Sequence, residues 1–359
     1  MPGLFADVLT VSNNPDTPAQ YTSLQEAVND AGNMDTILVS ASPFGYGTIT
    51  IEKNPVVIIG SGYNNPYGDY NSKMDYIYLK RKTISNSASG TVISGFDFYQ
   101  LTIYGEYGSG NDSTTQKMTD IVVERCRFDI FSFQGSNTVY RNISIRNNVV
   151  DYYVYFYPWG NSFLRGVTVH NNLFNGSYIS SYYDAATPTN SNDLSKVYIR
   201  NNVFVNRSTS YSFEGIYRAV IENNIFYESE PINCYQSTFN NNCTWFVSQA
   251  TLPYGDNGGD GPSNINQDPD FVEYDGGVFE YTDDFSLSGG SPCIDASTTF
   301  TGGLEGQGHD IGLYGLPLPF DIGENPAIPQ VTEITFPDNI SSVKVGGTLN
   351  VSFKAKKQD

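Results

Sequence analysis

Short alternations of apolar and polar residues recur through the middle of the chain, and each is followed by a polar corner and another apolar residue. Six such segments align without gaps: TVISGFDF from Thr91, IVVERCRF from Ile121, ISIRNNVV from Ile143, VTVHNNLF from Val167, VYIRNNVF from Val197 and AVIENNIF from Ala219. Apolar residues on an amphipathic helix recur about every 3.6 positions, which these segments do not show. Each segment is therefore predicted to be one short strand followed by a turn.

The spacing of these segments selects the architecture. Successive segments begin 22 to 30 residues apart. This is too short for a propeller blade of about 40 residues, and the leucine register of a leucine-rich repeat is absent. A coiled solenoid fits the spacing, with each turn adding short parallel strands about 4.8 Å from those of the previous turn.

Paired asparagines occupy the corner in four of the segments. Asparagine tolerates the left-handed backbone of a tight corner, and stacked side-chain amides can donate and accept hydrogen bonds along the axis of the coil. We therefore expect a structural ladder formed by Asn148, Asn172, Asn202 and Asn224.

The segment before the repeats has the features of an end cap. Ser23 and Glu26 form a capping box for a helix near residues 23–31. One face of this helix is apolar and can cover the open end of the first turn. That face consists of Leu24, Ala27, Val28 and Ala31.

With its two end segments, the chain resembles the right-handed parallel β-helix repeat proteins of the pectin lyase-like superfamily over most of residues 7–316. The opening YTSLQEAVNDAGNMDTILVSASPFGYGTITIEKNPVVIIGSGY is similar to the capped first turns of that superfamily. DPDFVEYDGGVFEYTDDFSLSGGSPCIDAS, followed by GHDIGLYG, is similar to the closing segment of many secreted bacterial β-helix proteins. The resemblance implies an all-β, right-handed parallel β-helix of the bacterial surface type and is nearly silent about activity.

The composition changes after residue 316. Residues 317–330 form a proline-punctuated linker, and residues 331–359 alternate like two or three strands of an immunoglobulin-like sandwich. A full sandwich needs about 100 residues, so this segment is part of one. Either the chain belongs to a longer multidomain surface protein, which we favour, or these strands pack on the solenoid.

Charge excludes several partners. The 359 residues include 38 acidic and 19 basic side chains, a net charge of −19 that would repel nucleic acid. No apolar run approaches the roughly 18 residues of a membrane span. Charged residues make up only 16% and aromatic residues 14%, which is typical of an extracellular all-β surface built from Asn, Ser, Thr, Gly and Tyr. Leu4 to Ala6 could be the end of a removed signal peptide.

The four cysteines are too few for a disulfide scaffold, and no C-x-x-C pair suggests a metal site. Cys234 and Cys243 are close enough in sequence to be bridged, whereas Cys126 lies in a repeat where a buried thiol is expected. The sequence leaves the pairing open.

The fourth position of the repeat carries a column of charged residues that alternation turns toward solvent. It contains Glu124, Arg146, His170, Arg200 and Glu222. In pectin lyase-like enzymes the outer face of such a sheet commonly holds the active groove. The resemblance therefore implies Arg146 and Arg200 as neutralisers of a uronate carboxylate and His170 as the base. The alternative, which we favour, is a ladder of compensating exposed pairs.

The ninth position offers a carboxylate pair, Asp129 and Asp151, on consecutive turns. Stacked carboxylates raise one pKa, and their separation could approach the roughly 5–5.5 Å of a retaining glycosidase. Solvated turn residues are the simpler interpretation. A bound calcium ion is conceivable at this pair, but no cluster of aspartates supports one, and no metal or cofactor is predicted.

Tyrosines follow the asparagine corners. Because Val154 and Phe156 are expected in the core, strand alternation turns Tyr153, Tyr155 and Tyr157 outward. Aromatic rings bury the C–H faces of sugars at low entropic cost, so an outer aromatic strip is a plausible glycan platform, although tyrosines also simply coat secreted β proteins. Further candidates for this strip are Trp159, Tyr182 and Tyr211.

Three functions are compatible with these features. The favoured one is a non-catalytic, secreted or cell-surface β-helix that binds polysaccharide or a cell-surface glycan, or acts in adhesion. The second is a polysaccharide lyase or glycoside hydrolase acting on acidic glycans. The third is a structural spacer of a larger surface protein. A fold used this widely does not by itself imply an activity.

Overall fold

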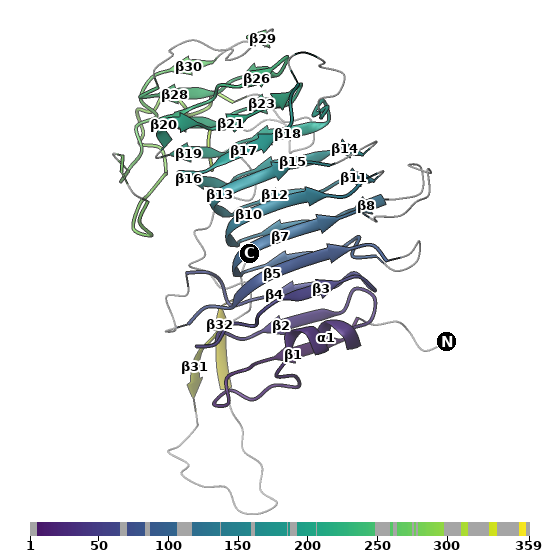
Figure 1. Cartoon of the computed structure of the whole chain (residues 1–359). Helices are drawn as coiled ribbons and strands as arrows, with labels where there is room; N and C mark the ends of the chain where they lie inside the picture. Colours follow the sequence, from purple (N-terminus) through teal and green to yellow (C-terminus); the bar gives the residue numbers. More distant parts are fainter. Residues whose placement is uncertain are drawn as a thin grey trace, which may run out of the picture.

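The computed structural model describes residues 6–64, 70–82, 87–105, 117–136, 138–158, 162–184, 186, 192–205, 207–247, 259–260, 264–274, 276–277, 279–297, 310–314, 330–335 and 352–356. For residues 207–210, 259–260, 330–335 and 352–356 it describes the backbone only. Two long parallel sheets both run along the axis of a coil, and each turn of the coil adds a strand to both of them (Figure 1). The predicted right-handed parallel β-helix is confirmed.

The first sheet contains the strands that begin each aligned repeat, stacked in parallel. In spatial order these strands are β1 (Val8–Val11), β2 (Thr36–Val39), β4 (Val57–Ile59), β6 (Val92–Ser94), β9 (Val122–Glu124), β12 (Ser144–Arg146), β15 (Val167–His170), β18 (Val197–Arg200), β23 (Val220–Glu222), β27 (Thr238–Asn240) and β29 (Gly259–Asp260).

The second sheet follows the corner of each repeat and is also parallel. Its main path is β3 (Ile49–Ile51), β5 (Lys73–Lys80), β7 (Asp97–Tyr104), β10 (Arg127–Gln134), β13 (Val149–Phe156), β16 (Leu173–Asn175), β19 (Val203–Val205), β24 (Ile225–Tyr227), β28 (Cys243–Trp245) and β30 (Ile265–Asn266). Beside β13 it continues through β17 (Tyr178–Ser181) and β21 (Phe213–Glu214).

Shorter strands complete some of the turns. A third parallel sheet contains β8 (Lys117–Thr119), β11 (Val139–Arg141) and β14 (Phe163–Arg165). Two parallel pairs join β20 (Arg207–Tyr211) with β25 (Ser229–Glu230) and β22 (Ile216–Tyr217) with β26 (Cys234–Tyr235).

In the region predicted to be sandwich-like, the structure describes one antiparallel pair, β31 (Gln330–Thr335) and β32 (Ser352–Lys356). The predicted linker, residues 317–330, lies outside the described residues except for Gln330. Leu4 and Phe5 of the proposed signal-peptide remnant also lie outside them.

A short helix, α1 (Leu24–Asp30), lies at the N-terminal end of the coil (Figure 1). The Ser23 hydroxyl accepts a hydrogen bond from the Glu26 backbone N–H at 3.3 Å, which satisfies one of the donors left over in the first helical turn. The buried face contains Leu24, Ala27 and Val28. The helix therefore covers apolar side chains that the first turn would otherwise expose.

The interior of the coil is filled by the first and third positions of the repeat and by aromatic rings at the eighth. Ile145, Val169 and Ile199 of the first sheet are fully buried. On the second sheet, Phe204 stacks between Phe174 at 4.3 Å and Phe226 at 4.9 Å, measured between ring centroids. Side chains of successive turns thus pack on one another along the axis.

The two asparagines of each corner have different roles. The first takes a left-handed backbone, with φ near 53° at Asn147 and 51° at Asn201. The second is fully buried and reaches the next turn, so that Asn148 donates to Asn172 at 3.0 Å and Asn202 donates to Asn224 at 2.9 Å. The amide ladder extends through Asn148, Asn172, Asn202, Asn224, Asn242 and Asn264.

A closing segment, residues 264–314 as far as they are described, packs on the outer side of the second sheet. The seventh position of the repeat is apolar on several turns, for example at Leu173 and Val203. These side chains form a separate buried cluster with Phe271, Phe285 and Ile311 of the closing segment. Part of the outer surface of the coil therefore belongs to a second hydrophobic core.

Candidate functional site

The charged column at the fourth repeat position is in register across six strands of the first sheet. Glu124, Arg146, His170, Arg200, Glu222 and Asn240 pair in this order. Each arginine is bound by a glutamate on a neighbouring strand: Arg146 lies 2.6 Å from Glu124, and Arg200 lies 2.9 Å from Glu222. Both cationic side chains are therefore already matched by carboxylates.

His170 lies between the two arginines. Its Nε2 is 3.2 Å from the Ser144 hydroxyl, and its Nδ1 is 2.9 Å from the Asn171 side-chain oxygen. Burial lowers the pKa of His170 below 6.5, and the positive charges of the two arginines lower it further, against the opposing effect of the hydrogen bond to the Asn171 side-chain oxygen. The imidazole is neutral at pH 7 and can act as a proton acceptor. Its hydrogen-bond partners, however, are Ser144 and Asn171 of the protein itself.

Because the pKa of His170 is lower in the folded chain, the unfolded chain takes up a proton first as the pH falls. Stability should therefore decrease as the pH falls below about 6.5, and His170→Gln should reduce this decrease. The measurement is the urea midpoint of both proteins at about pH 7.5 and pH 5.5. Parallel changes in the two proteins would contradict this assignment.

In the predicted carboxylate pair at the ninth position, Asp151 is already bound to other side chains. Asp151 accepts hydrogen bonds from Arg127 at 2.5 Å and from Asn175 at 3.0 Å. Burial raises the pKa of Asp129, with further contributions from the negative charges of Asp151 and Asp97. The strand register shifts beside Asp129. Asp151 is thus held as the partner of Arg127, which does not suit a nucleophile.

The second sheet carries a large group of tyrosines on its outer side, which we call the tyrosine face. Its members are Tyr76, Tyr78, Tyr99, Tyr104, Tyr152, Tyr153, Tyr155, Tyr157, Tyr178 and Tyr182. They form two groups, one on β5 and β7 and one on β13, β17 and the residues just after them. Alternation explains the placement, because Val154 and Phe156 point into the core.

The rings within each group touch. Tyr153 lies 5.8 Å from Tyr155 and 5.6 Å from Tyr178, and Tyr155 stacks with Tyr157 at 5.0 Å between centroids. Tyr182 is 41% exposed and meets Tyr157 edge-on at 6.1 Å. The group on β13 and β17 is therefore a continuous aromatic surface.

A row of small hydroxyl side chains lies between the two groups. Tyr78, Thr102, Ser132 and Tyr155 are opposite one another on β5, β7, β10 and β13. The Thr102 and Ser132 hydroxyls are buried and lie 3.0 Å apart, so they join the strands. At about 4.8 Å per strand, Tyr78 and Tyr155 lie about 14 Å apart along this row.

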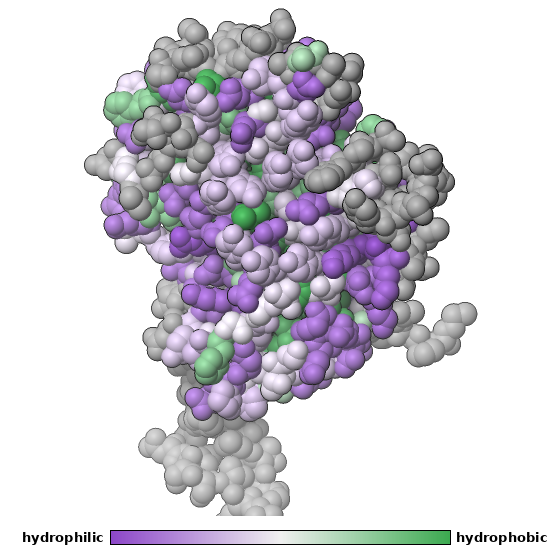
Figure 2. All heavy atoms as spheres, in the orientation of Figure 1, coloured by the Kyte–Doolittle hydropathy of each residue, from purple (hydrophilic) through white to green (hydrophobic). Residues whose placement is uncertain are grey.

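The tyrosines themselves are uncharged, and Glu214 on β21 places one carboxylate near Tyr155. Burial raises the pKa of Tyr155, and neighbouring tyrosines raise it further, so its phenol keeps its proton and remains a hydrogen-bond donor. One cation, Lys80, lies over the rings of Tyr78 and Tyr104, at 5.2 Å and 5.6 Å from their centroids. Figure 2 shows one face of the molecule, on which pale, weakly polar residues predominate over strongly hydrophobic ones.

Several sequence-predicted candidates are placed differently. Tyr211 belongs to the short β20–β25 pair, and Trp159 lies outside the described residues. Strict alternation would put Tyr152 in the core, but it is 52% exposed because the register shift lets it and Tyr153 both face outward. Tyr76 and Tyr78 were not among the predicted residues, although the Y-I-Y alternation before the first aligned repeat indicates two tyrosines on the same side of a strand.

The structure excludes one of the cysteine pairings that the sequence left open. Cys234 lies in the core inside the coil, whereas Cys243 lies in the cluster on the outer side of the second sheet. A wall of the coil separates the two thiols, so they cannot be bridged as their closeness in sequence suggested. Cys126 is buried, and its burial raises the pKa of its thiol to about 12.

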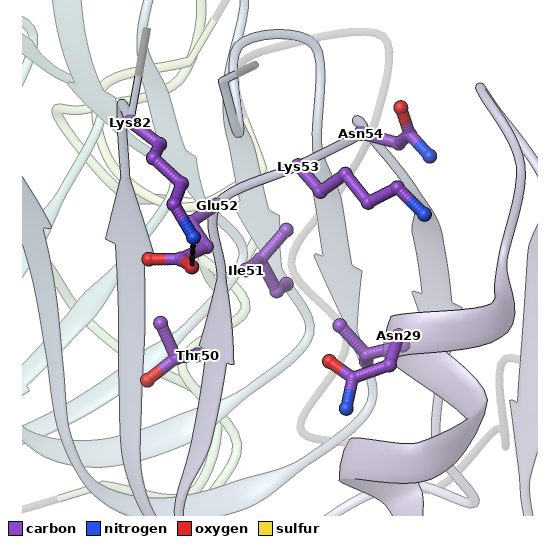
Figure 3. Close-up of a pocket in the computed structure, with 8 residues that line it drawn as sticks. Asn29, Thr50, Ile51, Glu52, Lys53, Asn54 and Lys82 are labelled. Atoms are coloured by element: carbon purple, nitrogen blue, oxygen red, sulfur yellow. Dashed lines mark hydrogen bonds and ion pairs between the residues drawn. The ribbon is translucent and has the colours of Figure 1, made fainter.

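A cavity of about 350 Å³ lies where α1 meets the first turns. Figure 3 shows Asn29 of the helix on one side of it and Lys82, paired with Glu52 at 2.8 Å, on the other. It contains none of the sequence-predicted site residues. Within the described ranges, no group of three or more His, Cys, Asp or Glu residues could hold a metal ion.

Comparisons with known proteins give only a structural likeness. No protein-family model matches the sequence, and no curated protein matches it either. Among solved structures, pectate lyase Pel9A is similar with a TM-score of 0.39 and 14% identity over 86% of this chain and 96% of that one. The pectin methylesterase from Aspergillus niger is similar with a TM-score of 0.25 and 12% identity over 72% of this chain and 87% of that one.

None of the helices in the described part of the chain is long and apolar enough to cross a membrane. The chain has the parallel β-helix fold that its resemblance to pectin lyase-like proteins implied.

Proposed function

We propose that this chain is a secreted or cell-surface β-helix that binds an uncharged polysaccharide through its tyrosine face, without catalysis. The observation that supports this most is the continuous aromatic surface on β13 and β17. There the ring of Tyr155 contacts Tyr153 on one side and Tyr157 on the other. Such rings cover the apolar faces of pyranose sugars, and the phenol hydroxyls add hydrogen bonds.

Charge favours an uncharged ligand. The net charge of −19 opposes the approach of a polyanion. Arg146 and Arg200, the side chains that would neutralise a uronate, are each bound to a glutamate. Binding a uronate there would mean breaking an ion pair that is partly shielded from water.

The proposal is tested with Tyr153→Ala/Tyr155→Ala. Each aromatic contact is worth about 0.5–1.5 kcal/mol, so we expect affinity for a bound neutral glycan to fall about tenfold or more. The measurement is a glycan array of neutral and uronate polysaccharides, followed by titration calorimetry on the best ligand, with circular dichroism to verify folding.

The matched control is Tyr183→Ala/Tyr217→Ala, which removes two tyrosines that contact each other at 5.5 Å and are not members of the tyrosine face. This variant should bind like the parent protein. Equal affinities of all three proteins would exclude the tyrosine face as the binding surface, and silence of the parent protein on every glycan would favour a structural spacer instead.

A second candidate is a lyase that acts on acidic glycans. It is favoured by one observation, the placement of neutral His170 between Arg146 and Arg200 on adjacent strands. Incubation with uronate polysaccharides would then produce unsaturated ends with ultraviolet absorbance, and His170→Gln would abolish them. Reducing ends without that absorbance would indicate a hydrolase.

A further inference from the structure

Two of the four cysteines meet where the closing segment packs on the coil. Cys243 is on β28 of the second sheet, and Cys293 is in the closing segment. Both side chains are fully buried and belong to the same hydrophobic cluster. The Cys243 side chain is the principal polar neighbour of the Cys293 thiol, and the Cys243 thiol itself donates to the Gln267 carbonyl at 3.2 Å. Neither thiol is bonded to another cysteine in this structure.

The backbone on both sides holds this pair in place. The Cys293 N–H donates to the Ser291 hydroxyl at 3.1 Å, and its carbonyl accepts from the Ile311 N–H at 2.9 Å. The Cys243 N–H donates to the Asn224 carbonyl at 2.8 Å, as part of the parallel stacking of the coil. The fold on each side therefore holds the two thiols in the same buried cluster.

The other two cysteines lack this arrangement. Cys126 donates to the Glu124 carbonyl at 3.1 Å, and Cys234 lies 3.9 Å from the Ile232 carbonyl. Both are in the core inside the coil, and no contact between either of them and another thiol is found among the described residues. They serve as internal controls for any chemistry at the first pair.

We propose that Cys243 and Cys293 form a disulfide that fastens the closing segment across the outer side of the second sheet. In the reaction, one thiolate attacks a small-molecule or protein disulfide and forms a mixed disulfide. The second thiolate displaces the carrier sulfur. One S–S bond forms in the protein, two protons leave its thiols, and the two electrons reduce the oxidant to two thiols.

Burial sets the order of events. The neighbouring Cys243 side chain and the apolar surroundings raise the pKa of Cys293, which disfavours the thiolate once the segment has docked. Exchange should therefore occur during folding, before the cluster closes. Afterwards the same burial would protect the bond from reductants.

The bond would join residues that lie 50 positions apart, Cys243 and Cys293. Such a cross-link reduces the number of conformations open to the unfolded chain, and it keeps the closing segment from detaching. The segment carries Tyr281, which accepts a hydrogen bond from Arg127 at 2.5 Å, so the fastened stretch reaches back over several turns. This inference does not depend on the proposed glycan binding.

The first test is peptide mapping of the full chain refolded with oxidised glutathione, then denatured and alkylated without reductant. We expect alkylation of Cys126 and Cys234 only, with one cross-linked peptide that joins Cys243 and Cys293 and weighs two hydrogens less than the sum. Alkylation of all four cysteines, or a cross-link between other cysteines, would overturn the proposal.

The second test compares melting temperatures of oxidised and reduced samples. The oxidised parent protein should melt higher than the reduced one by on the order of 5 °C. Cys293→Ser should lose this difference, whereas the matched variant Cys234→Ser should keep it. An equal difference in the Cys293→Ser protein would contradict the assignment, and the mapping of the parent protein decides the question even if a variant fails to fold.

Discussion

Replacing Phe204 with alanine is expected to lower the free energy of unfolding by about 3–5 kcal/mol, the cost of emptying a large aromatic site in a packed core. Phe204 is fully buried, and its ring lies within 5.5 Å of Phe174, Phe226 and Phe213, measured between centroids. The cavity left by the ring would be lined by these three phenylalanines. Because each of them is also held by the packed core, we expect them to fill little of the cavity by moving into it. Urea unfolding followed by circular dichroism measures the change.

The matched control for this substitution is Phe246→Ala. Phe246 is 62% exposed at the end of β28, so its removal should change stability by less than about 1 kcal/mol. Equal losses in the two variants would mean that the aromatic column inside the coil does not stabilise it more than a surface ring does.

Asn202→Ala is expected to cost about 3 kcal/mol, because a buried amide that loses its partner costs about 1–3 kcal/mol and several partners are lost here. The Asn202 side chain accepts from the backbone N–H and the side-chain amide of Asn172, both at 3.0 Å. It donates to Asn224 and to the Val169 carbonyl, both at 2.9 Å. Urea unfolding again gives the measurement.

Asn240→Ala removes the same side chain from the outer side of the first sheet. The Asn240 amide donates only a long hydrogen bond, 3.4 Å, to Glu222 among the described residues, so we expect a loss below about 0.5 kcal/mol. If Asn202→Ala lowered the free energy of unfolding as little as this control does, the amide ladder would not stabilise the corners of the coil.

The repeat pattern was enough to predict much of the fold. A gap-free alignment places Ile145, Val169 and Ile199 at one repeat position, and the strands pair them in that register. The order of the charged column follows from the same alignment. In this part of the coil the register follows the alignment of the repeats, which is why this level of detail was accessible.

The candidate site was less accessible, because contacts between distant segments do not follow from the repeat. The pairing of Arg127 with Tyr281 joins residues 154 positions apart. Cys243 packs against the closing segment, a contact that the repeat does not predict. Its closeness to Cys234 in the sequence had suggested a different neighbour. The register shift beside Asp129 depends on local packing and changed which side of the strand Tyr152 occupies.

The links of the amide ladder are interchangeable. From Asn148 to Asn242, each side chain offers the same acceptor to the preceding turn and the same donor to the following one. A duplicated turn inserted anywhere in this stretch would therefore meet complementary neighbours above and below. Gene duplication could therefore lengthen the coil by whole turns while the hydrogen bonds between turns stay the same. The length of the molecule can thus change in evolution independently of the side chains on its outer surface.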